Sequence, residues 1–441
     1  MALKDLFKKK KSNRSCVVGL DGVPYTLVNR FIEDGTWPFT AGLVKNGALT
    51  QMKVTLPEIS AVSWPSFMTG KNPGEHGIFG FTELGENYSM RFTNFLDLKV
   101  PTLWDKIGKE GKTSVVINQP GTYPAREIPG VLVSGFVAIE LHKAVKPLKY
   151  LATLRRNSYE IDIDTMRCRR DHNQLFVELK KTLNGRKAVI DAAWQDEDWD
   201  FFQAVVTGTD RLQHYIWSAV EDESHDRHEK AIEYYRSIDD FIKYMWEKHH
   251  SSVSVDNEGD GFFMLSDHGF CGIKQEVYIN AWLRDNGYLS FEKDEPESLS
   301  DISADAKALC LDPGRIYIHT KGRYPKGKVT ESEVETLKKE IKEKLESLCY
   351  HEEKVIEFVK TNEDAYSGPE AKNGPDLVAV GNHGFDIKGS PNAKEVFGRS
   401  DLTGMHTWDD AFFWSRENPG DGLNITDLAN IVTRPLGVKE L

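Results

Sequence analysis

The sequence predicts an α/β fold: a mostly parallel, doubly wound sheet with an inserted helical cap and a smaller α+β lobe. Two observations predict it. Short apolar, β-branched or aromatic runs alternate with helix-length amphipathic stretches along much of the 441-residue chain, a pattern typical of a parallel sheet covered by helices on both faces. Two segments, 139–198 and 289–402, interrupt this alternation.

The expected strands are short and apolar, as in strands buried on both faces of a sheet. They are "SCVVGL" at 15–20, "TSVVIN" at 113–118, "FFQAVVT" at 201–207, "FFMLS" at 262–266, "DLVAV" at 376–380 and "AFFW" at 411–414. The expected helices between them are "TLVNRFIEDG" at 26–35, "TLWDKIGKEG" at 102–111 and "HEKAIEYYRSIDDFIKYMWEKHH" at 228–250. In such a sheet, ligand sites gather at the carboxyl ends of the strands.

The first interruption, 139–198, is predicted to be a basic helical cap with a helix at 172–194. Residues 139–190 hold twelve Lys/Arg against six Asp/Glu, a local charge of +6 in a chain of net charge −12. Two interpretations stay open. The segment is either a packed surface helix with solvated charges, or a cap whose basic face attracts an anionic substrate.

The second interruption, 289–402, is predicted to be the smaller α+β lobe. It contains "GRIYIHTKGRYPKGKV" and the charged helix "ESEVETLKKEIKEKLESL". The remaining segments, 13–138, 199–288 and 403–441, are expected to form the core that carries function.

The composition limits the class of protein. With 39% apolar and 28% charged residues, the chain resembles soluble globular proteins. Its net charge of −12 argues against a stable nucleic-acid partner, because an acidic surface is repelled by phosphates. No apolar run reaches the ~18 residues of a membrane helix, so no transmembrane segment is predicted.

Cysteine usage and the N-terminus bear on location. The five cysteines are dispersed and none forms a CxxC pair, which indicates unpaired thiols in a reducing, cytoplasmic environment. The stretch "MALKDLFKKKKSNRS" is basic and lacks the apolar centre of an export signal. We expect its lysine run to be a solvated tail, with weak contact to an anionic membrane as the alternative.

Six carboxylate and imidazole side chains fall at four expected strand ends. They are Asp21, Asp210, His214, Asp267, His268 and His406. Taken singly, each has an ordinary interpretation, such as a turn or a helix cap. Asp210 and His214 are four residues apart, so a helix beginning there puts both on one face. Together, mixed oxygen and nitrogen donors at one sheet edge predict a site for Zn²⁺ or Mn²⁺ rather than Ca²⁺ or Mg²⁺.

A hydroxyl-rich stretch, "LPEISAVSWPSFMTG" at 56–70, lies far upstream of most of these donors. It offers Ser60, Ser63, Ser66 and Thr69. A serine near neutral pH is a weak nucleophile and needs an adjacent base or a metal ion to activate it. The metal-binding donors therefore make one of these hydroxyls a candidate nucleophile.

This set of motifs resembles the alkaline phosphatase superfamily, and most closely its type I phosphodiesterase/nucleotide pyrophosphatase branch. The motifs are "GLDG", "NPGEHGIFGF", "TDRLQH", "SDHG", "GMH" and a hydroxyl ten positions before the glycine of "FMTG". The resemblance covers about residues 15–138, 199–290 and 403–435. It implies an alkaline-phosphatase-like fold and cleavage of small anionic phosphodiesters or nucleotide-like pyrophosphates.

The resemblance also implies which hydroxyl is the nucleophile. The position ten before Gly70 is Ser60. A rival register places it at Ser63, because "SWPSF" looks like a shifted sulfatase signature. That signature requires an arginine where Phe67 stands, and its own ten-position spacing also returns Ser60. Ser66 and the remaining threonine are expected to be packing hydroxyls.

The resemblance further assigns two divalent ions. Asp210, His214 and His406 would hold one, and the other would be held by Asp21, Asp267 and His268. Ser60 Oγ would lie between the ions as a shared ligand. Two ions about 3.5–4 Å apart can clamp the attacking and leaving oxygens of an in-line displacement. Attack by Ser60 would then give a phosphoseryl intermediate.

Two departures and two alternatives qualify this assignment. Nucleotide pyrophosphatases carry an asparagine where this chain has Phe81, and "GNHGFD" offers His383 as a rival to His406. A phosphomonoesterase or phosphomutase would use the same ions and nucleophile, and Lys71 is the candidate for binding terminal phosphate oxygens. A catalytically silent binding protein on this fold is the alternative from another class.

Overall fold

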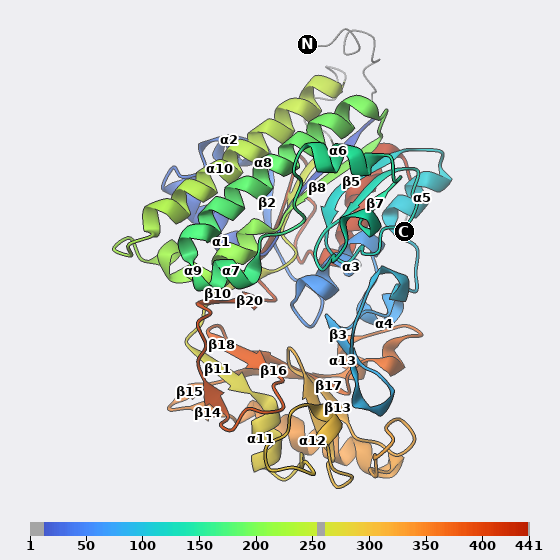
Figure 1. Cartoon of the computed structure of the whole chain (residues 1–441), viewed down its shortest axis with the longest axis vertical. Coiled ribbons are helices and arrows are strands. Elements are labelled where there is room, and N and C mark those ends of the chain that lie inside the picture. The colour runs from blue at the N-terminus through green and yellow to red at the C-terminus, as the bar shows by residue number, and fades with distance from the viewer. Residues whose placement is uncertain (1–12, 254–260, 440–441) are drawn as a thin grey trace.

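The largest element of the fold is an eight-stranded sheet in the order β2-β21-β9-β1-β8-β5-β6-β7 (Figure 1). The computed structural model describes residues 13–253 and 261–439. The strands are β2 (Ala48–Met52), β21 (Ala411–Ser415), β9 (Phe262–Leu265), β1 (Ser15–Leu20), β8 (Phe201–Val206), β5 (Ser114–Gln119), β6 (Gly130–Ser134) and β7 (Val145–Lys146). The five central strands pair in parallel, while β21 and β7 pair antiparallel on either side. The predicted mostly parallel sheet is confirmed.

Helices cover both faces of this sheet because β1 alternates its side chains between two cores. Cys16, Val18 and Leu20 face one core and Val17 faces the other. The helices of the first core are α1 (Tyr25–Glu33), α2 (Pro38–Val44), α8 (His172–Asp196), α9 (Gly208–Glu221) and α10 (His228–Ser252). Those of the second are α3 (Ser60–Thr69), α5 (Leu103–Lys109) and α14 (Leu428–Thr433).

Residues 139–198 contribute to the first core and to the sheet. They form β7, α6 (Tyr150–Arg156), α7 (Thr165–Arg170) and α8. The apolar side of α8, including Leu175, Leu179 and Ile190, is buried in the same core as β1. Most of its charged side chains lie away from this core, although Arg186 is buried, so the helix packs on the sheet largely as an amphipathic helix does.

A smaller group of elements lies below the central sheet in Figure 1 and has its own apolar core. Its four-stranded sheet has the order β12 (Ala308–Leu311), β13 (Arg315–Ile318), β17 (Leu377–Gly381) and β16 (Ile356–Thr361). Its helices are α11 (Ile279–Asp285) and α12 (Glu331–Glu346). A three-stranded sheet, β18 (Phe385–Lys388), β11 (Gln275–Tyr278) and β19 (Phe397–Gly398), completes this core.

The short remaining elements are β3 (Thr82–Leu84), β4 (Met90–Phe92), β10 (Gly269–Gly272), β14 (Cys349–Tyr350), β15 (Glu353–Lys354), β20 (Gly404–Thr407), α4 (Pro73–His76) and α13 (Asn362–Ala365). The hairpin of β3 and β4 follows α4. Strand β20 pairs antiparallel with β10, just beyond the end of β9. This pairing brings the C-terminal part of the chain to the functional edge of the central sheet.

The six expected strands all form, with two differences in placement. The segment at 376–380 forms β17, which is antiparallel to β13 and β16 in the smaller sheet. Its partner strands, β13 and β16, belong to the same inserted segment, 289–402. The strands of the mostly parallel sheet come from the segments before and after it. The segment at 411–414 forms β21, which runs antiparallel to β9.

Three further strands, β2, β6 and β7, belong to the central sheet although the sequence analysis did not single them out. The lysine run of the N-terminus lies outside the described residues. Within the part of the chain that the structure describes, no helix combines the length and apolar character needed to cross a membrane.

Candidate active site

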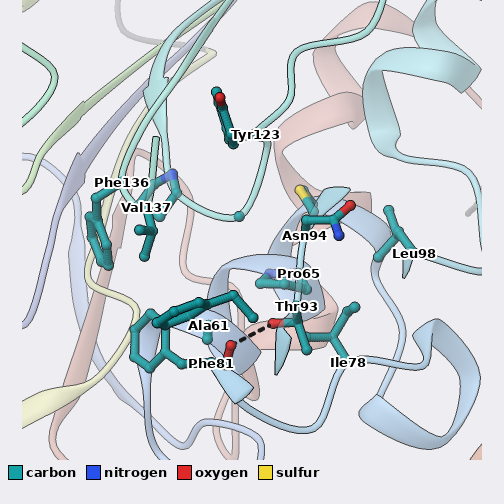
Figure 2. Close-up of a pocket in the computed structure, with 14 residues that line it drawn as sticks. Ala61, Pro65, Ile78, Phe81, Thr93, Asn94, Leu98, Tyr123, Phe136 and Val137 are labelled. Carbon is teal, nitrogen blue, oxygen red and sulfur yellow. Dashed lines mark hydrogen bonds between the residues drawn. The ribbon is translucent and has the colours of Figure 1, made fainter. Parts of the chain in front are cut away.

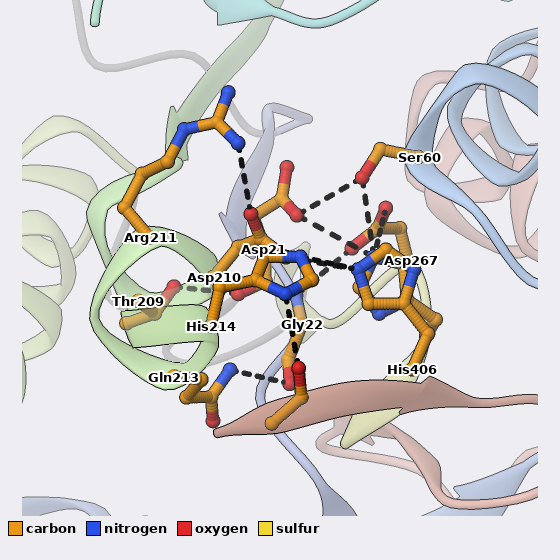
Figure 3. Close-up of polar contacts among 12 residues, drawn as sticks. Asp21, Gly22, Ser60, Thr209, Asp210, Arg211, Gln213, His214, Asp267 and His406 are labelled. Atoms are coloured by element: carbon orange, nitrogen blue, oxygen red, sulfur yellow. Dashed lines mark hydrogen bonds and ion pairs between the residues drawn. The ribbon is translucent and has the colours of Figure 1, made fainter. Parts of the chain in front are cut away.

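The carboxyl edge of the central sheet gathers the seven side chains expected to bind metal, six of which are labelled in Figure 3. Asp21 directly follows β1, and Asp267 and His268 lie two and three residues after the end of β9. Asp210 and His214 lie on the first turns of α9, which begins after β8. The last two are His406 on β20 and Ser60, the first residue of α3.

Asp210, His214 and His406 form the first group of potential metal-ligand side chains (donor groups). His406 Nε2 lies 2.9 Å from His214 Nε2 and 3.2 Å from Asp210 Oδ1. His214 Nε2 lies 3.3 Å from the same Asp210 oxygen. The i, i+4 spacing on α9 therefore places both side chains against the histidine of β20.

The second group is formed by Asp21, Asp267 and His268. His268 Nε2 lies 3.4 Å from Asp267 Oδ2 and 3.7 Å from Asp21 Oδ1. Ser60 Oγ lies 3.1 Å from His268 Nε2 and 3.2 Å from Asp21 Oδ1. The two groups adjoin, because the rings of His268 and His406 stack with centroids 3.7 Å apart.

All three imidazoles are held with Nε2 directed into the site. Each Nδ1 contacts a backbone carbonyl oxygen: His214 that of Gly404 (3.1 Å), His268 that of Gly269 (3.0 Å) and His406 that of Glu58 (2.9 Å). A carbonyl oxygen only accepts hydrogen bonds, so each Nδ1 carries the hydrogen and donates it. In the neutral ring, Nε2 is then left with a lone pair, which is the arrangement of a metal-binding histidine.

Burial sets the charge state of these groups. It raises the pKa of Asp21 well above its ordinary range, and the nearby Asp267 adds to the shift. Burial likewise raises the pKa of Asp267 to about 8. The pKa of Asp210 lies well below its usual range because contacts with His214 and His406 outweigh its burial. Burial lowers the pKa of His268 and of His406, which favours the neutral ring, the form that could bind a metal ion.

The donor set fits divalent metal ions. Asp21, Asp267 and His268 have no exposed surface, and Asp267 Oδ2 has no hydrogen-bond partner among the described residues. A buried carboxylate oxygen left unpaired is costly. A cation bound between the converging oxygen and Nε2 atoms would remove that cost, and the mixture of O and N donors suits transition metals.

Several supporting side chains were missed by the sequence analysis. Trp64 Nε1 donates to Asp21 Oδ2 (3.1 Å), and the backbone N–H of Gly22 donates to Asp267 Oδ1 (3.0 Å). Gly22 has a φ of +70°, and a Cβ there would come within 3.1 Å of the His268 ring. The glycine of "GLDG" is therefore needed for both backbone conformation and space.

Arg211 is the most prominent residue that the sequence analysis passed over, although "TDRLQH" contains it. Its Nη1 donates to Asp210 Oδ2 (3.2 Å), while Nε and Nη2 donate to Asp162 Oδ2 (3.0 and 2.7 Å). The guanidinium also lies 4.6 Å from the centroid of the Phe136 ring. The available sequence signal was a basic residue next to Asp210. The pairing of Arg211 with Asp162, which is 49 residues away in the chain, has no such signal.

The four hydroxyls of the 56–70 stretch have different surroundings. Ser60 is 2% exposed and is the one that touches the donor groups. Ser63 is fully buried on α3 and its Oγ has no hydrogen-bond partner among the described residues. Ser66 donates to a carbonyl one turn earlier and contacts His76 Nε2 (3.0 Å). Thr69 also donates to a carbonyl one turn earlier.

The rival histidine and the candidate lysine lie away from these contacts. His383 Nε2 is 3.1 Å from Asp409 Oδ1, and its side chain is 52% exposed. Lys71 Nζ lies 3.9 Å from a Glu75 oxygen across one helical turn. The structure therefore brings His406, rather than His383, to the donors of α9.

Comparison with protein families gives one match over most of the chain. The model described as type I phosphodiesterase / nucleotide pyrophosphatase matches residues 15–409. The chain belongs to this family. Membership supports hydrolysis of phosphoric esters, and the expected resemblance to the alkaline phosphatase superfamily is confirmed. No curated protein sequence matches the chain.

Solved structures of low sequence identity share the fold of this family member. Phosphonoacetate hydrolase from Sinorhizobium meliloti 1021, in complex with phosphonoformate, has a TM-score of 0.63 at 15% identity, over 97% of this chain and 96% of its own. Alkaline phosphatase PafA has a TM-score of 0.60 at 13% identity, over 97% of each chain. An inactive variant of murine ectonucleotide pyrophosphatase/phosphodiesterase 5, in complex with AMP, scores 0.53 at 13%, over 98% and 96%.

Proposed function

We propose that this protein is a metal-dependent hydrolase that cleaves phosphodiester or pyrophosphate bonds through a phosphoseryl intermediate on Ser60. The observation that carries the proposal is the position of Ser60 Oγ, 3.1 Å from His268 Nε2 and 3.2 Å from Asp21 Oδ1. Family membership supports the reaction class. The proposed substrate is a small anionic phosphodiester or nucleotide-like ester.

Two divalent transition-metal ions, Zn²⁺ or Mn²⁺, are the proposed cofactors. Asp210, His214 and His406 would hold one ion, and Ser60 Oγ would lie between it and the other. The ligands of that second ion would be Asp21, Asp267 and His268. When bound, such ions lower the pKa of a coordinated hydroxyl and neutralise charge on phosphoryl oxygens.

The chain's own residues supply the nucleophile and its orientation. In the first step, Ser60 Oγ loses its proton to solvent and forms a bond to phosphorus. The bond from phosphorus to the leaving oxygen breaks, and that oxygen departs with the electron pair. In the second step, water attacks phosphorus and the Ser60 oxygen leaves, so the hydroxyl is restored. Ser60 is the first residue of α3, whose N-terminal N–H groups favour the negative phosphoryl group.

Arg211 is proposed as a positioning residue of this reaction. It holds one oxygen of Asp210 while Asp162 holds the guanidinium. The other Asp210 oxygen is then directed at His214 and His406. A buried, charge-assisted network of this kind fixes a ligand carboxylate in one orientation.

The alternatives within the superfamily receive less support. A phosphomonoesterase would use a cation for the terminal phosphate oxygens, but Lys71 lies against Glu75. A silent binding protein would not need six converging donors with fixed imidazole orientations. Loading the purified protein with Mn²⁺ or Zn²⁺ and comparing bis-p-nitrophenyl phosphate with p-nitrophenyl phosphate tests the proposal. We expect the diester to be preferred; preference for the monoester, or no turnover of either, would contradict it.

We also propose a cytoplasmic location. It is supported by the five cysteines, all of which are free thiols, with Cys16, Cys168 and Cys310 buried. Proteins of oxidising compartments more often pair their cysteines.

A further inference from the structure

A pocket without charged side chains is lined by Ala61, the residue that follows Ser60 (Figure 2). Its enclosed volume is small, about 40 Å³, and it opens onto the surface. Most of its lining is apolar, including Ala61, Pro65, Phe81, Phe92, Phe136 and Val137. A mostly apolar lining with a few polar groups is typical of small-molecule sites.

The wall of this pocket is joined to the reaction centre at two places. Ala61 follows Ser60 on the first turn of α3, and Phe81 packs against Ala61. Phe81 lies 6.1 Å from Phe136, centroid to centroid. Phe136 in turn carries the guanidinium that binds Asp210. A group attached to a phosphoryl on Ser60 therefore has the pocket directly beside it.

The mouth of the pocket is unusually apolar for a protein surface. Phe92 is 67% exposed and Val137 is 49% exposed, and both line the pocket. Three other exposed apolar side chains lie two residues from a lining residue: Met90, Leu96 and Ile139. Exposed apolar side chains gathered around a pocket are typical of ligand-binding or interaction sites.

Two polar side chains of the lining already have local partners. Thr93 Oγ1 donates to the Gly80 carbonyl (2.7 Å), and Asn94 Oδ1 accepts from the Leu96 N–H (2.9 Å). Tyr123 is the one further polar side chain of the lining among the described residues. A nucleobase buried here would therefore find few groups for its donors and acceptors, and unpaired buried polar groups are costly. The chemistry of the lining favours an alkyl or aryl group.

We propose that this pocket binds an apolar alkyl or aryl group that remains esterified to the phosphoryl group when the leaving group departs. In an in-line displacement the leaving oxygen departs opposite the nucleophile. Ala61 lines the pocket next to Ser60, on the attacking side of phosphorus, so the proposal assigns the pocket to the retained group rather than to the leaving group on the far side. The inference rests on the proposed function and names its substrate class: phosphodiesters of an apolar alcohol.

A series of diesters with one common leaving group tests this inference. The metal-loaded protein is assayed on the p-nitrophenyl esters of methyl, hexyl, phenyl and thymidine 5′-phosphate. We expect kcat/KM to rise about fourfold for each methylene that enters the pocket. The hexyl and phenyl esters should therefore exceed the methyl ester by tenfold or more, and both should exceed the thymidine ester.

Two variants test whether the preference for the hexyl ester over the methyl ester arises in this pocket. Phe81→Asn should reduce the hexyl-to-methyl ratio toward one while the methyl ester is still hydrolysed. Leu148→Ser replaces an apolar side chain that is 55% exposed and outside the pocket, and it should leave the ratio unchanged. If the methyl and hexyl esters are hydrolysed equally, or the thymidine ester is best, the inference is wrong while the proposed function stands.

A binding measurement separates the inference from catalysis. Titration calorimetry of metal-loaded Ser60→Ala with hexyl phosphate and with methyl phosphate needs no turnover. Hexyl phosphate should bind at least tenfold more tightly, and adding Phe81→Asn should abolish the difference. Equal affinities would overturn the inference whatever the diester assays show. Failure to hydrolyse any ester, with the affinity difference intact, would overturn the proposed function alone.

Discussion

His406 Nε2 lies 2.9 Å from His214 Nε2, and each ring donates its Nδ1–H to a backbone carbonyl. The two Nε2 atoms therefore face one another across a hydrogen-bond distance. A cation bound there together with Asp210 Oδ1, which lies 3.2 Å from His406 Nε2, would be coordinated by both rings. The contact therefore bears directly on metal content.

We expect about two transition-metal ions per chain in protein purified without chelators. Substituting His406 by alanine should lower the content to about one and remove most activity. His383→Gln is the matched control, because that histidine pairs with Asp409 away from the donors. Inductively coupled plasma mass spectrometry measures the content. Full metal content in His406→Ala would show that this ring is not a ligand.

Chelation should also lower the melting temperature. Metal bound only by the folded state stabilises it by about 2.7 kcal/mol when free metal is 100 times its Kd. The carboxylates of Asp21 and Asp267 are buried, so the metal-free fold must bury uncompensated charge or take up protons. Differential scanning calorimetry before and after chelation should show a fall of several degrees, reversed by adding metal.

Arg211 should be important for kcat although it carries no metal. Arg211→Met keeps much of the side chain's length and removes the hydrogen bonds to Asp210 and Asp162. We expect kcat/KM to fall by ~10–100-fold, the range seen when a ligand's supporting partner is lost. Asp162→Asn should cause a smaller loss, because the guanidinium keeps its contact with Asp210.

The control for this prediction is Arg236→Gln, which breaks an exposed ion pair with Glu229 on α10. Exposed pairs contribute little to stability, so activity and melting temperature should both be unchanged. Metal affinity measured by competition with a chromophoric chelator should fall in Arg211→Met and not in Arg236→Gln. Unaltered metal affinity and kcat in Arg211→Met would exclude a positioning role.

The positive charge of segment 139–198 has two open interpretations that kinetics can separate. Arg169 is paired with Asp401, whereas Arg155, Arg156 and Arg170 lie exposed on α6 and α7. If their field attracts an anionic substrate, reversing the three exposed charges to glutamate should raise KM at low salt. The difference should shrink near 0.1 M salt, where the screening length is ~10 Å. Equal KM values at low salt would assign these arginines to the solvated surface.

His383 should make stability depend on pH. Its hydrogen bond to Asp409 raises the pKa of the imidazole above its ordinary value. A raised pKa in the folded state gives stability that is fully present below the unfolded pKa of about 6.5. That stability is lost as the pH rises through the folded pKa. The side chain is half exposed, so a few tenths of a kcal/mol is the expected size.

The measurement compares wild type with His383→Gln by urea unfolding at pH 5.5 and pH 8.5. The wild type should be more stable than the variant at pH 5.5, and the difference should shrink at pH 8.5. A difference that grows with pH would mean that the protonated imidazole is not the stabilising form.

The side chains singled out from the sequence lie together in the structure because strand order imposes their meeting. Asp21 and Asp267 follow strands that are neighbours in a parallel sheet, so their ends must coincide. The i, i+4 spacing on α9 needed only local geometry. By contrast, the pairing of Arg211 with Asp162 and of Phe81 with Phe136 depends on loops whose paths have no periodic signal.

The same reason explains what was missed in the fold. Strand β7 is two residues long and β2 is only partly buried, so neither forms a distinct apolar run. The carbonyls that orient the three imidazoles are backbone groups, and no residue type predicts them. The proposed apolar pocket could not be predicted from the sequence either. From the sequence, Phe81 shows only that the asparagine of nucleotide pyrophosphatases is absent, and its neighbours in space are known only from the structure.

The last prediction concerns Ser60 itself. Ser60→Ala should lose several orders of magnitude in kcat, because its hydroxyl is the one of the four in 56–70 that contacts the donor groups. Ser60→Thr keeps the hydroxyl and should retain appreciable activity. Ser63→Ala removes an Oγ that has no hydrogen-bond partner among the described residues, so its effect on activity and stability should be small.

Mass spectrometry of acid-quenched enzyme distinguishes the two registers directly. During turnover of a diester, the peptide containing Ser60 should gain one phosphoryl group that still carries the retained ester. The adduct should be absent from Ser60→Ala and present in Ser63→Ala, since attack needs an oxygen within coordination reach of the two donor groups. An adduct on Ser63, or full activity without any adduct in Ser60→Ala, would show that the nucleophile has been assigned to the wrong hydroxyl.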